Sequence, residues 1–268
     1  MQRRAFIPAA AAAVFAASAV QPAEAAARHE ASPFNDAASL FPENPAFREI
    51  QGRLAADATG YAEALTEREK RIAVLAAWVG TGCAEAFEAK AGDLAGDVLK
   101  PEEIRELVYQ SAAYMGAGRA AKLFAAMNRG FAKAGIQSPD ETKAMQGDRR
   151  TSGNKLQIEG YGQHMERRWE KVPEDISPVH KLLADNCFGD YYARPSSLTW
   201  QEREFFTFDM LAACAFAPAQ ARSHAAGSVR CGVTRAKLLG ALWVMLPWVG
   251  YPTTLNAVSA VNEATKKA

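Results

Sequence analysis

Glu204 and His224 are the residues whose types and spacing favour proton-transfer chemistry. His224 lies in PAQARSHAAGS (218–228), a run of small residues typical of a closely packed helix, and Glu204 lies twenty residues earlier on another predicted helix. A turn at 216–218 would let the two helices run antiparallel and bring both side chains to one crevice. A carboxylate beside an imidazole raises its basicity and fixes its tautomer, which a proton-transfer site needs. The alternatives are a packed or capping histidine and an exposed helix-face glutamate.

Arg222 is the third polar residue in this region. It precedes His224 by two residues, so its side chain points roughly 200° around the helix from the histidine. Arg222 therefore need not share the crevice. By its length it could reach a carboxylate, and it could equally be a surface charge or a contact with a neighbouring subunit.

Helices must position these residues, because strand signals are almost absent after residue 30. The apolar residues of 66–79 recur at helical spacing, as Ile72, Leu75, Ala76 and Val79. Similar spacing predicts helices over 102–114, 119–132, 199–214, 235–246 and 253–263, and a further helix within 176–193. Helix starts are indicated by Thr66, Thr199 and Thr234 as N-caps and by Pro101 and Pro252 in first turns. The protein is predicted to be all-α.

The helical segments recur within the chain. LTEREKRIAVLAAWVGTG (65–82) aligns with LTWQEREFFTFDMLAACA (198–215), 133 residues apart, and 107–124 aligns with 241–258, 134 residues apart. The second alignment places Gly116 over Gly250. We therefore predict an internal duplication, with one repeat over 40–133 and a second over 188–266. Residues 134–187 are predicted to be a linker and connecting helix, with 138–155 a linker or exposed loop because it carries turn residues and charges and few apolar residues.

Charge and cysteine usage exclude several classes of protein. The net charge is +1 and no basic block is interleaved with aromatic residues, so no nucleic-acid surface is expected. The four cysteines are widely spaced and form no C-x-x-C, so neither a zinc site nor a thioredoxin-like redox pair is indicated; they are Cys83, Cys187, Cys214 and Cys231. Buried inert thiols are expected, and a disulfide remains open. The other histidines, His29, His164 and His180, have no partners at metal-ligand spacing.

The first 25 residues have the organisation of an export signal. Arg3 and Arg4 precede an uncharged stretch over 6–20, and Ala23-Glu24-Ala25 supplies an A-x-A cleavage site. The start also resembles a twin-arginine signal. We expect residues 1–25 to be removed and the mature protein to be periplasmic. The alternative is an uncleaved N-terminal anchor.

The second repeat resembles the carboxymuconolactone decarboxylase family of the alkyl hydroperoxidase D-like superfamily. The resemblance rests on LTWQEREFFTF, QARSHAAGSVRCGVTRAKL and LPWVGYPTTLNAV, with the lead-in FGDYYARPSSL at 188–198. It extends more weakly over the first repeat and implies a tandem alkyl hydroperoxidase D-like helical bundle. In the first repeat, Arg71 and Lys90 stand where the second has Glu204 and His224.

The resemblance also bears on the reaction. The alkyl hydroperoxidase D-like branch carries C-x-x-C-x-x-x-H, but the two cysteine positions are Ala217 and Gln220 here. The decarboxylase-like branch keeps R-S-H without cysteine, which implies cofactor-independent loss of carbon dioxide from a small carboxylated lactone or related acid. His224 would then donate a proton, Glu204 would orient it, and Arg222 would contact a carboxylate or oxyanion.

Two other functions remain open. One is a peroxide-reducing antioxidant activity that uses Cys83, and the other is a non-catalytic periplasmic ligand-binding or scaffold role. Single-repeat relatives assemble into rings of six from three dimers, so the resemblance implies a homotrimer for a duplicated chain. A monomeric mass in solution would contradict that expectation.

Overall fold

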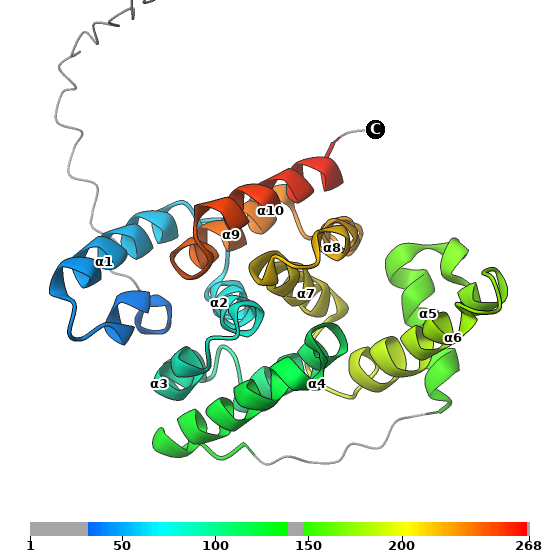
Figure 1. Cartoon of the computed structure of the whole chain (residues 1–268), viewed down its shortest axis with the longest axis horizontal. Coiled ribbons are helices and arrows are strands. Elements are labelled where there is room, and N and C mark those ends of the chain that lie inside the picture. The colour runs from blue at the N-terminus through cyan, green and yellow to red at the C-terminus, as the bar shows by residue number, and fades with distance from the viewer. Residues whose placement is uncertain (1–31, 139–146, 267–268) are drawn as a thin grey trace, which may run out of the picture.

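The computed structural model describes residues 32–138 and 147–266, so the predicted signal at 1–25 lies outside the described residues. Throughout the described ranges the regular elements are helices and there is no strand, which confirms the all-α class (Figure 1). The α-helices are α1 Pro45–Gly60, α2 Glu67–Thr81, α3 Ala84–Leu94, α4 Pro101–Lys133, α5 Arg149–Tyr161, α6 Ser177–Leu182, α7 Trp200–Cys214, α8 Pro218–Arg230, α9 Arg235–Val249 and α10 Tyr251–Ala264. The short helices are η1 Pro33–Asn35, η2 Ala37–Leu40, η3 Gln163–Met165, η4 Arg168–Glu170 and the π-helix η5 Leu183–Tyr192.

Helices α2 and α7 begin with the same local structure. The Thr66 hydroxyl accepts a hydrogen bond from the Glu69 amide at 3.2 Å, and the Glu69 carboxylate accepts one from the Thr66 amide at 2.9 Å. Thr199 and Glu202 repeat this reciprocal pattern at 3.1 and 2.8 Å. Each pair is a capping box, which satisfies amides that a helix start leaves without an intrahelical partner. The predicted caps at Thr66 and Thr199 are confirmed.

Two glycines break the helices at corresponding places. The helices predicted over 102–114 and 119–132 form one element, α4, which Gly116 interrupts with φ 73° and ψ 157°. Gly250 separates α9 from α10 with φ 75° and ψ 169°. Glycine adopts this left-handed region without the clash that a Cβ would cause. The shared conformation favours the predicted duplication.

Helices α2 and α7 pack against each other at the centre of the molecule (Figure 1). A Cβ placed on Gly80 would lie 2.5 Å from the Cβ of Ala213, its counterpart in the predicted repeat, so the helices approach very closely there. At the opposite end of the pair, Arg68 donates a hydrogen bond to Glu202. Corresponding ends of the two helices therefore lie together, as they do in a two-fold symmetric interface. The duplication itself stays a prediction, which this pairing supports.

A hydrophobic core fills the space around this helix pair. Its largest fully buried side chains include Trp78, Phe87, Phe206 and Phe208. Trp78 also contacts Trp248 edge to face, with ring centroids 5.6 Å apart, and the Trp248 indole donates a hydrogen bond to Asn35 Oδ1 at 2.7 Å. This bond ties the N-terminal η1 to α9. Among the described residues, none of the helices has the length and apolar character that crossing a bilayer requires.

The segment predicted as a linker or exposed loop over 138–155 contains the start of a helix. Helix α5 begins at Arg149, where the Asp148 carboxylate accepts a hydrogen bond from the Thr151 amide at 2.8 Å. It packs against η5 so closely that a Cβ on Gly153 would lie 1.9 Å from the Ala184 carbonyl oxygen. Gly153 allows this close approach, and the apolar residues of α5 that pack on η5 are only Leu156 and Tyr161. Hydrophobic periodicity therefore gave no sign of the helix.

Replacing Gly153 with alanine should lower the free energy of unfolding by about 3 kcal/mol, the upper end of the range of about 1–3 kcal/mol that is typical of overpacking. The effect is large because the new methyl group would meet backbone atoms that cannot rotate away. Urea denaturation of the full chain measures the effect. Gly118→Ala is the matched control, since a Cβ there meets nothing within 4 Å and alanine favours the helix. Equal stability of the two variants would contradict the close packing of α5.

Candidate functional site

The hairpin of α7 and α8 brings Glu204 and His224 together. Ala215 takes a left-handed conformation (φ 57°) at the end of α7, and α8 starts at Pro218. The two helices then pack so that His224 Nδ1 lies 2.9 Å from Glu204 Oε2. Glu204 is fully buried and His224 is 7% exposed. The two side chains therefore meet at a buried position between α7 and α8.

The small residues of α8 make room for the carboxylate. Gly227 lies three residues after His224, on the same side of the helix. A Cβ at this position would come within 2.7 Å of Glu204 Oε2. The polar histidine and the small residues around it are thus parts of one arrangement, in which a glycine lets the glutamate approach the helix.

Tyr161 is a third member of the site that the sequence reasoning missed. It ends α5, and its hydroxyl lies 2.9 Å from Glu204 Oε2 and 2.8 Å from His224 Nδ1. We call Tyr161, Glu204 and His224 the Tyr-Glu-His cluster. Tyr161 belongs to the segment predicted as a linker, and no motif marks it. Only the long-range packing of α5 places it here.

The surroundings of the cluster are apolar or weakly acidic. The Tyr114 ring stands edge-on to His224, with centroids 5.3 Å apart, and the Tyr114 hydroxyl lies 2.9 Å from that of Tyr192. Burial raises the pKa of Tyr114, Tyr161 and Tyr192 well above the usual value, with the Glu204 carboxylate adding to the effect. These phenols therefore stay protonated at neutral pH. The site can donate hydrogen bonds to a carboxylate but carries little counter-charge.

Arg222 does not join this cluster. Its side chain is half exposed, and its Nε lies 3.8 Å from Glu263 Oε2. It lines a separate cavity of about 310 Å³ that also involves Asn256 and Ser259 of α10. This placement agrees with the helical phase of Arg222, which sets it on a different side of α8 from His224.

A model of the carboxymuconolactone decarboxylase family matches residues 178–263. Residues 178–263 are therefore similar to that family, and the match covers less than half of the chain. The matched segment includes Glu204, Arg222 and His224, and it begins ten residues before the start predicted for the second repeat. No curated protein matches the chain. The helical architecture agrees with the alkyl hydroperoxidase D-like fold that the resemblance implied.

The segment that matches the family receives part of its site from outside its own sequence. Glu204 and His224 lie inside the matched segment, whereas Tyr161 and Tyr114 precede it. Tyr161 comes from α5 and Tyr114 from α4, in the predicted first repeat. Residues on three sides of His224 thus come from three parts of the chain.

The cysteines of the chain are four free thiols, of which Cys187 and Cys231 lie nearest to Glu204. Burial, with a contribution from the Glu204 carboxylate, raises the pKa of Cys187 to about 12 and that of Cys231 to about 11. Burial also raises the pKa of Cys83 and Cys214. The thiolate is the reactive form, so all four side chains are held in the unreactive state at neutral pH. Among the described residues, no three histidine, cysteine or acidic side chains are grouped to hold a metal ion.

The corresponding place in the predicted first repeat is filled by the chain itself. Lys90 donates a hydrogen bond from Nζ to the Pro33 carbonyl at 2.8 Å, and the Arg71 guanidinium lies 4.7 Å from the centre of the Phe34 ring. Phe34 is buried. Element η1 therefore occupies the space that faces these two positions. Among the described residues of the predicted first repeat, Arg71 and Lys90 therefore do not form a second copy of the Tyr-Glu-His cluster.

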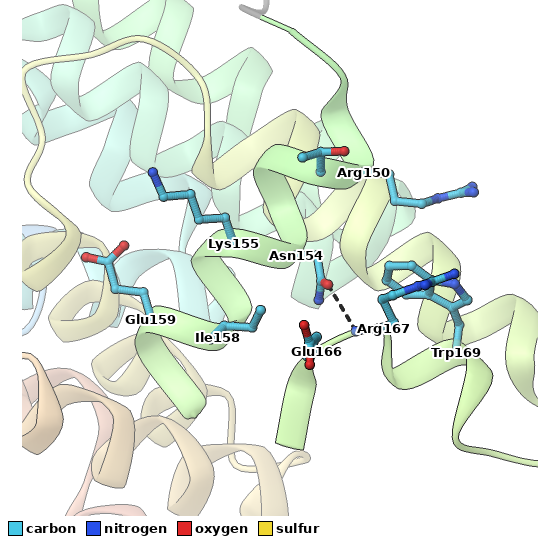
Figure 2. A pocket seen from close by; sticks show the side chains of 9 residues that line it. Arg150, Asn154, Lys155, Ile158, Glu159, Glu166, Arg167 and Trp169 are labelled. Carbon is cyan, nitrogen blue, oxygen red and sulfur yellow. Dashed lines mark hydrogen bonds between the residues drawn. The ribbon is translucent and has the colours of Figure 1, made fainter. Parts of the chain in front are cut away.

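A cavity of about 570 Å³ lies beside α5. Figure 2 shows Asn154 and Ile158 of α5 facing the segment with Glu166 and Arg167, where the Arg167 amide donates to Asn154 Oδ1 at 3.0 Å. Neither Glu204 nor His224 lines this cavity. It is open to the surface and distinct from the Tyr-Glu-His cluster.

Proposed function

We propose that the chain is a cofactor-independent enzyme of the carboxymuconolactone decarboxylase type, acting on a small carboxylated lactone or related acid. One observation carries the proposal: a buried carboxylate, Glu204, holds His224 Nδ1 at 2.9 Å. Within the described residues no hydrogen bond engages the other ring nitrogen, Nε2. An imidazole held in this way by a carboxylate is suited to giving and taking a proton at its second nitrogen.

The proposed reaction proceeds in two steps. The bond between the substrate carbon and its carboxylate breaks, carbon dioxide leaves, and the electron pair moves into the conjugated lactone carbonyl to form an enolate. Protonated His224 then delivers its Nε2 proton to carbon, and the neutral imidazole takes a proton from water to restore the starting state. Glu204 stabilises the imidazolium form by its charge. Arg222 takes no part in this scheme within a single chain, because it lies outside the cluster.

The proposal predicts turnover of unsaturated lactones that carry a carboxylate. Purified protein incubated with such compounds in D₂O should release carbon dioxide and leave a product with one deuterium on carbon, detectable by mass spectrometry. Protein inactivated by heat provides the control for spontaneous decarboxylation. Absence of release above that control for every compound in the class would contradict the proposed reaction.

Thiol-dependent peroxide reduction is the weaker candidate. It requires a nucleophilic thiolate and a second cysteine to form a disulfide. Burial raises the pKa of Cys83, and the cysteine positions nearest His224 are Ala217 and Gln220. The chemistry of these residues supports proton transfer over thiol redox chemistry.

A further inference from the structure

The hydroxyl of Tyr161 contacts both partners of the proton-transfer pair at once. It lies 2.9 Å from Glu204 Oε2 and 2.8 Å from His224 Nδ1, while those two atoms lie 2.9 Å from each other. Three polar atoms thus form a closed triangle. The phenol and Nδ1 each offer at most one hydrogen, so the positions of those hydrogens decide which ring nitrogen of His224 exchanges protons.

We propose that Tyr161 is a positioning residue that donates its hydrogen to Glu204 and thereby fixes His224 with Nδ1 protonated and Nε2 as the exchanging atom. In this arrangement the carboxylate oxygen accepts two hydrogen bonds, one from each neighbour. The opposite arrangement, with the phenol donating to Nδ1, would leave Oε2 facing two lone pairs at 2.9 Å. A carboxylate disfavours such contacts because it can only accept hydrogen bonds.

The surroundings of His224 support this assignment. The groups around the cluster are Tyr161 of α5, Tyr114 of α4, Tyr192 and Cys187 of η5, Glu204 of α7, and Arg230 and Cys231 at the end of α8. Burial raises the pKa of the three tyrosines and both cysteines, so these groups stay neutral. The exposed Arg230 guanidinium contacts the Gly160 carbonyl rather than the cluster. The Glu204 carboxylate therefore acts on the imidazole with Tyr161 as its other donor.

Tyr161 also moderates the pull of Glu204 on the imidazole proton. A hydrogen bond to the charged form of a carboxylate stabilises that form and weakens its attraction for a nearby cation. Removing the hydroxyl should strengthen the hold of Glu204 on protonated His224. The prediction rests on the proposed function for its catalytic meaning, but its measurement needs no substrate.

Nuclear magnetic resonance of the ¹⁵N-labelled full chain tests the assignment. The chain has four histidines, and loss of one signal set in His224→Gln identifies the residue. In the unaltered protein the neutral His224 ring should show a protonated Nδ1 and an unprotonated Nε2. In Tyr161→Phe, which keeps the ring that packs on Phe188 at 5.9 Å, the resonance of the Nδ1 hydrogen of His224 should move downfield, because Glu204 Oε2 loses its second donor and accepts a stronger hydrogen bond from Nδ1.

Tyr192→Phe is the matched buried control. Its hydroxyl bonds to Thr207 and Tyr114 and not to Glu204 or His224, so the His224 tautomer and the resonance of its Nδ1 hydrogen should stay as in the unaltered protein. A protonated Nε2 in the neutral ring, or the same Nδ1 hydrogen resonance with and without the Tyr161 hydroxyl, would overturn the proposal. If Tyr161→Phe does not fold, the tautomer of the unaltered protein alone decides. A negative lactone assay leaves this result untouched, so the two proposals fail separately.

Discussion

Replacing His224 with glutamine should lower the rate of lactone decarboxylation by about 10²- to 10⁴-fold, the range typical for loss of a general acid or base. Glutamine keeps a polar side chain of similar length but cannot deliver a proton at neutral pH. The neighbouring Glu204 would keep a hydrogen-bond donor, so the buried carboxylate need not be left without a partner. Steady-state rates of carbon dioxide release measure the effect.

His164→Gln is the matched control for this loss. His164 lies in η3 on the surface and outside the Tyr-Glu-His cluster, so its replacement should leave the rate unchanged. Arg222→Gln tests the remaining polar residue, and it should also leave the rate nearly unchanged because Arg222 pairs with Glu263 outside the cluster. An active His224→Gln variant would remove the proposed proton donor. A large loss in Arg222→Gln would show that this residue reaches the substrate after all.

The second large effect concerns stability. Asp209 of α7 is fully buried, and among the described residues neither of its carboxylate oxygens has a hydrogen-bond partner. Burial raises its pKa well above the usual value, and the negative charge of Glu69 adds to this. The folded state therefore binds the Asp209 proton more tightly than the unfolded chain does, whose aspartates titrate near about 3.9.

The sign of the pH dependence follows from linkage. Below about pH 3.9 Asp209 is protonated in both states, and its contribution to stability is fully present. As the pH rises, the unfolded chain releases the proton first, so the free energy of unfolding falls by about 1.4 kcal/mol per pH unit. The fall continues until the folded-state pKa is reached. Asp209 thus weakens the fold progressively above about pH 4.

Asp209→Asn should remove this dependence. The stability of the variant relative to the unaltered protein should increase with pH between about 4 and 7, and urea denaturation at several pH values measures the difference. The exposed residue Asp175 provides the control, because Asp175→Asn should give a curve parallel to that of the unaltered protein. If the curve of stability against pH for Asp209→Asn is also parallel to that of the unaltered protein, Asp209 has a partner that stabilises its charged form.

The sequence was sufficient to predict the helices of the matched domain and the meeting of Glu204 and His224. Both residues lie on consecutive helices joined by a short turn, and the capping boxes at Thr66 and Thr199 are local patterns. Helical geometry left open whether Arg222 shares the site, and the structure places its side chain outside the cluster, beside Glu263. Periodicity and capping rules predict interactions within one helix or between two consecutive helices.

Other features depend on contacts between distant segments. Tyr161 reaches the cluster because α5 packs on η5, where Gly153 allows the close approach and only Leu156 and Tyr161 add apolar contacts, too few to leave a helical pattern in the sequence. Asp209 stands in an apolar run where a charged residue normally indicates an exposed position, yet its neighbours bury it completely. Element η1 fills the space beside Lys90, and it precedes the segments that the repeat alignment compares. The alignment therefore could not predict this contact. Each of these needs the tertiary structure.

The hydrogen bond between Asn35 and Trp248 joins residues that are 213 positions apart. During synthesis, residues 33–35 leave the ribosome long before Trp248 has been added to the chain. The N-terminal element can meet Lys90 and Arg71 early, but the indole that holds it in place arrives only when α9 is complete. Such long-range closure is slow because it requires ordering of the chain in between. The first segment of the described chain to be made is therefore among the last to be secured.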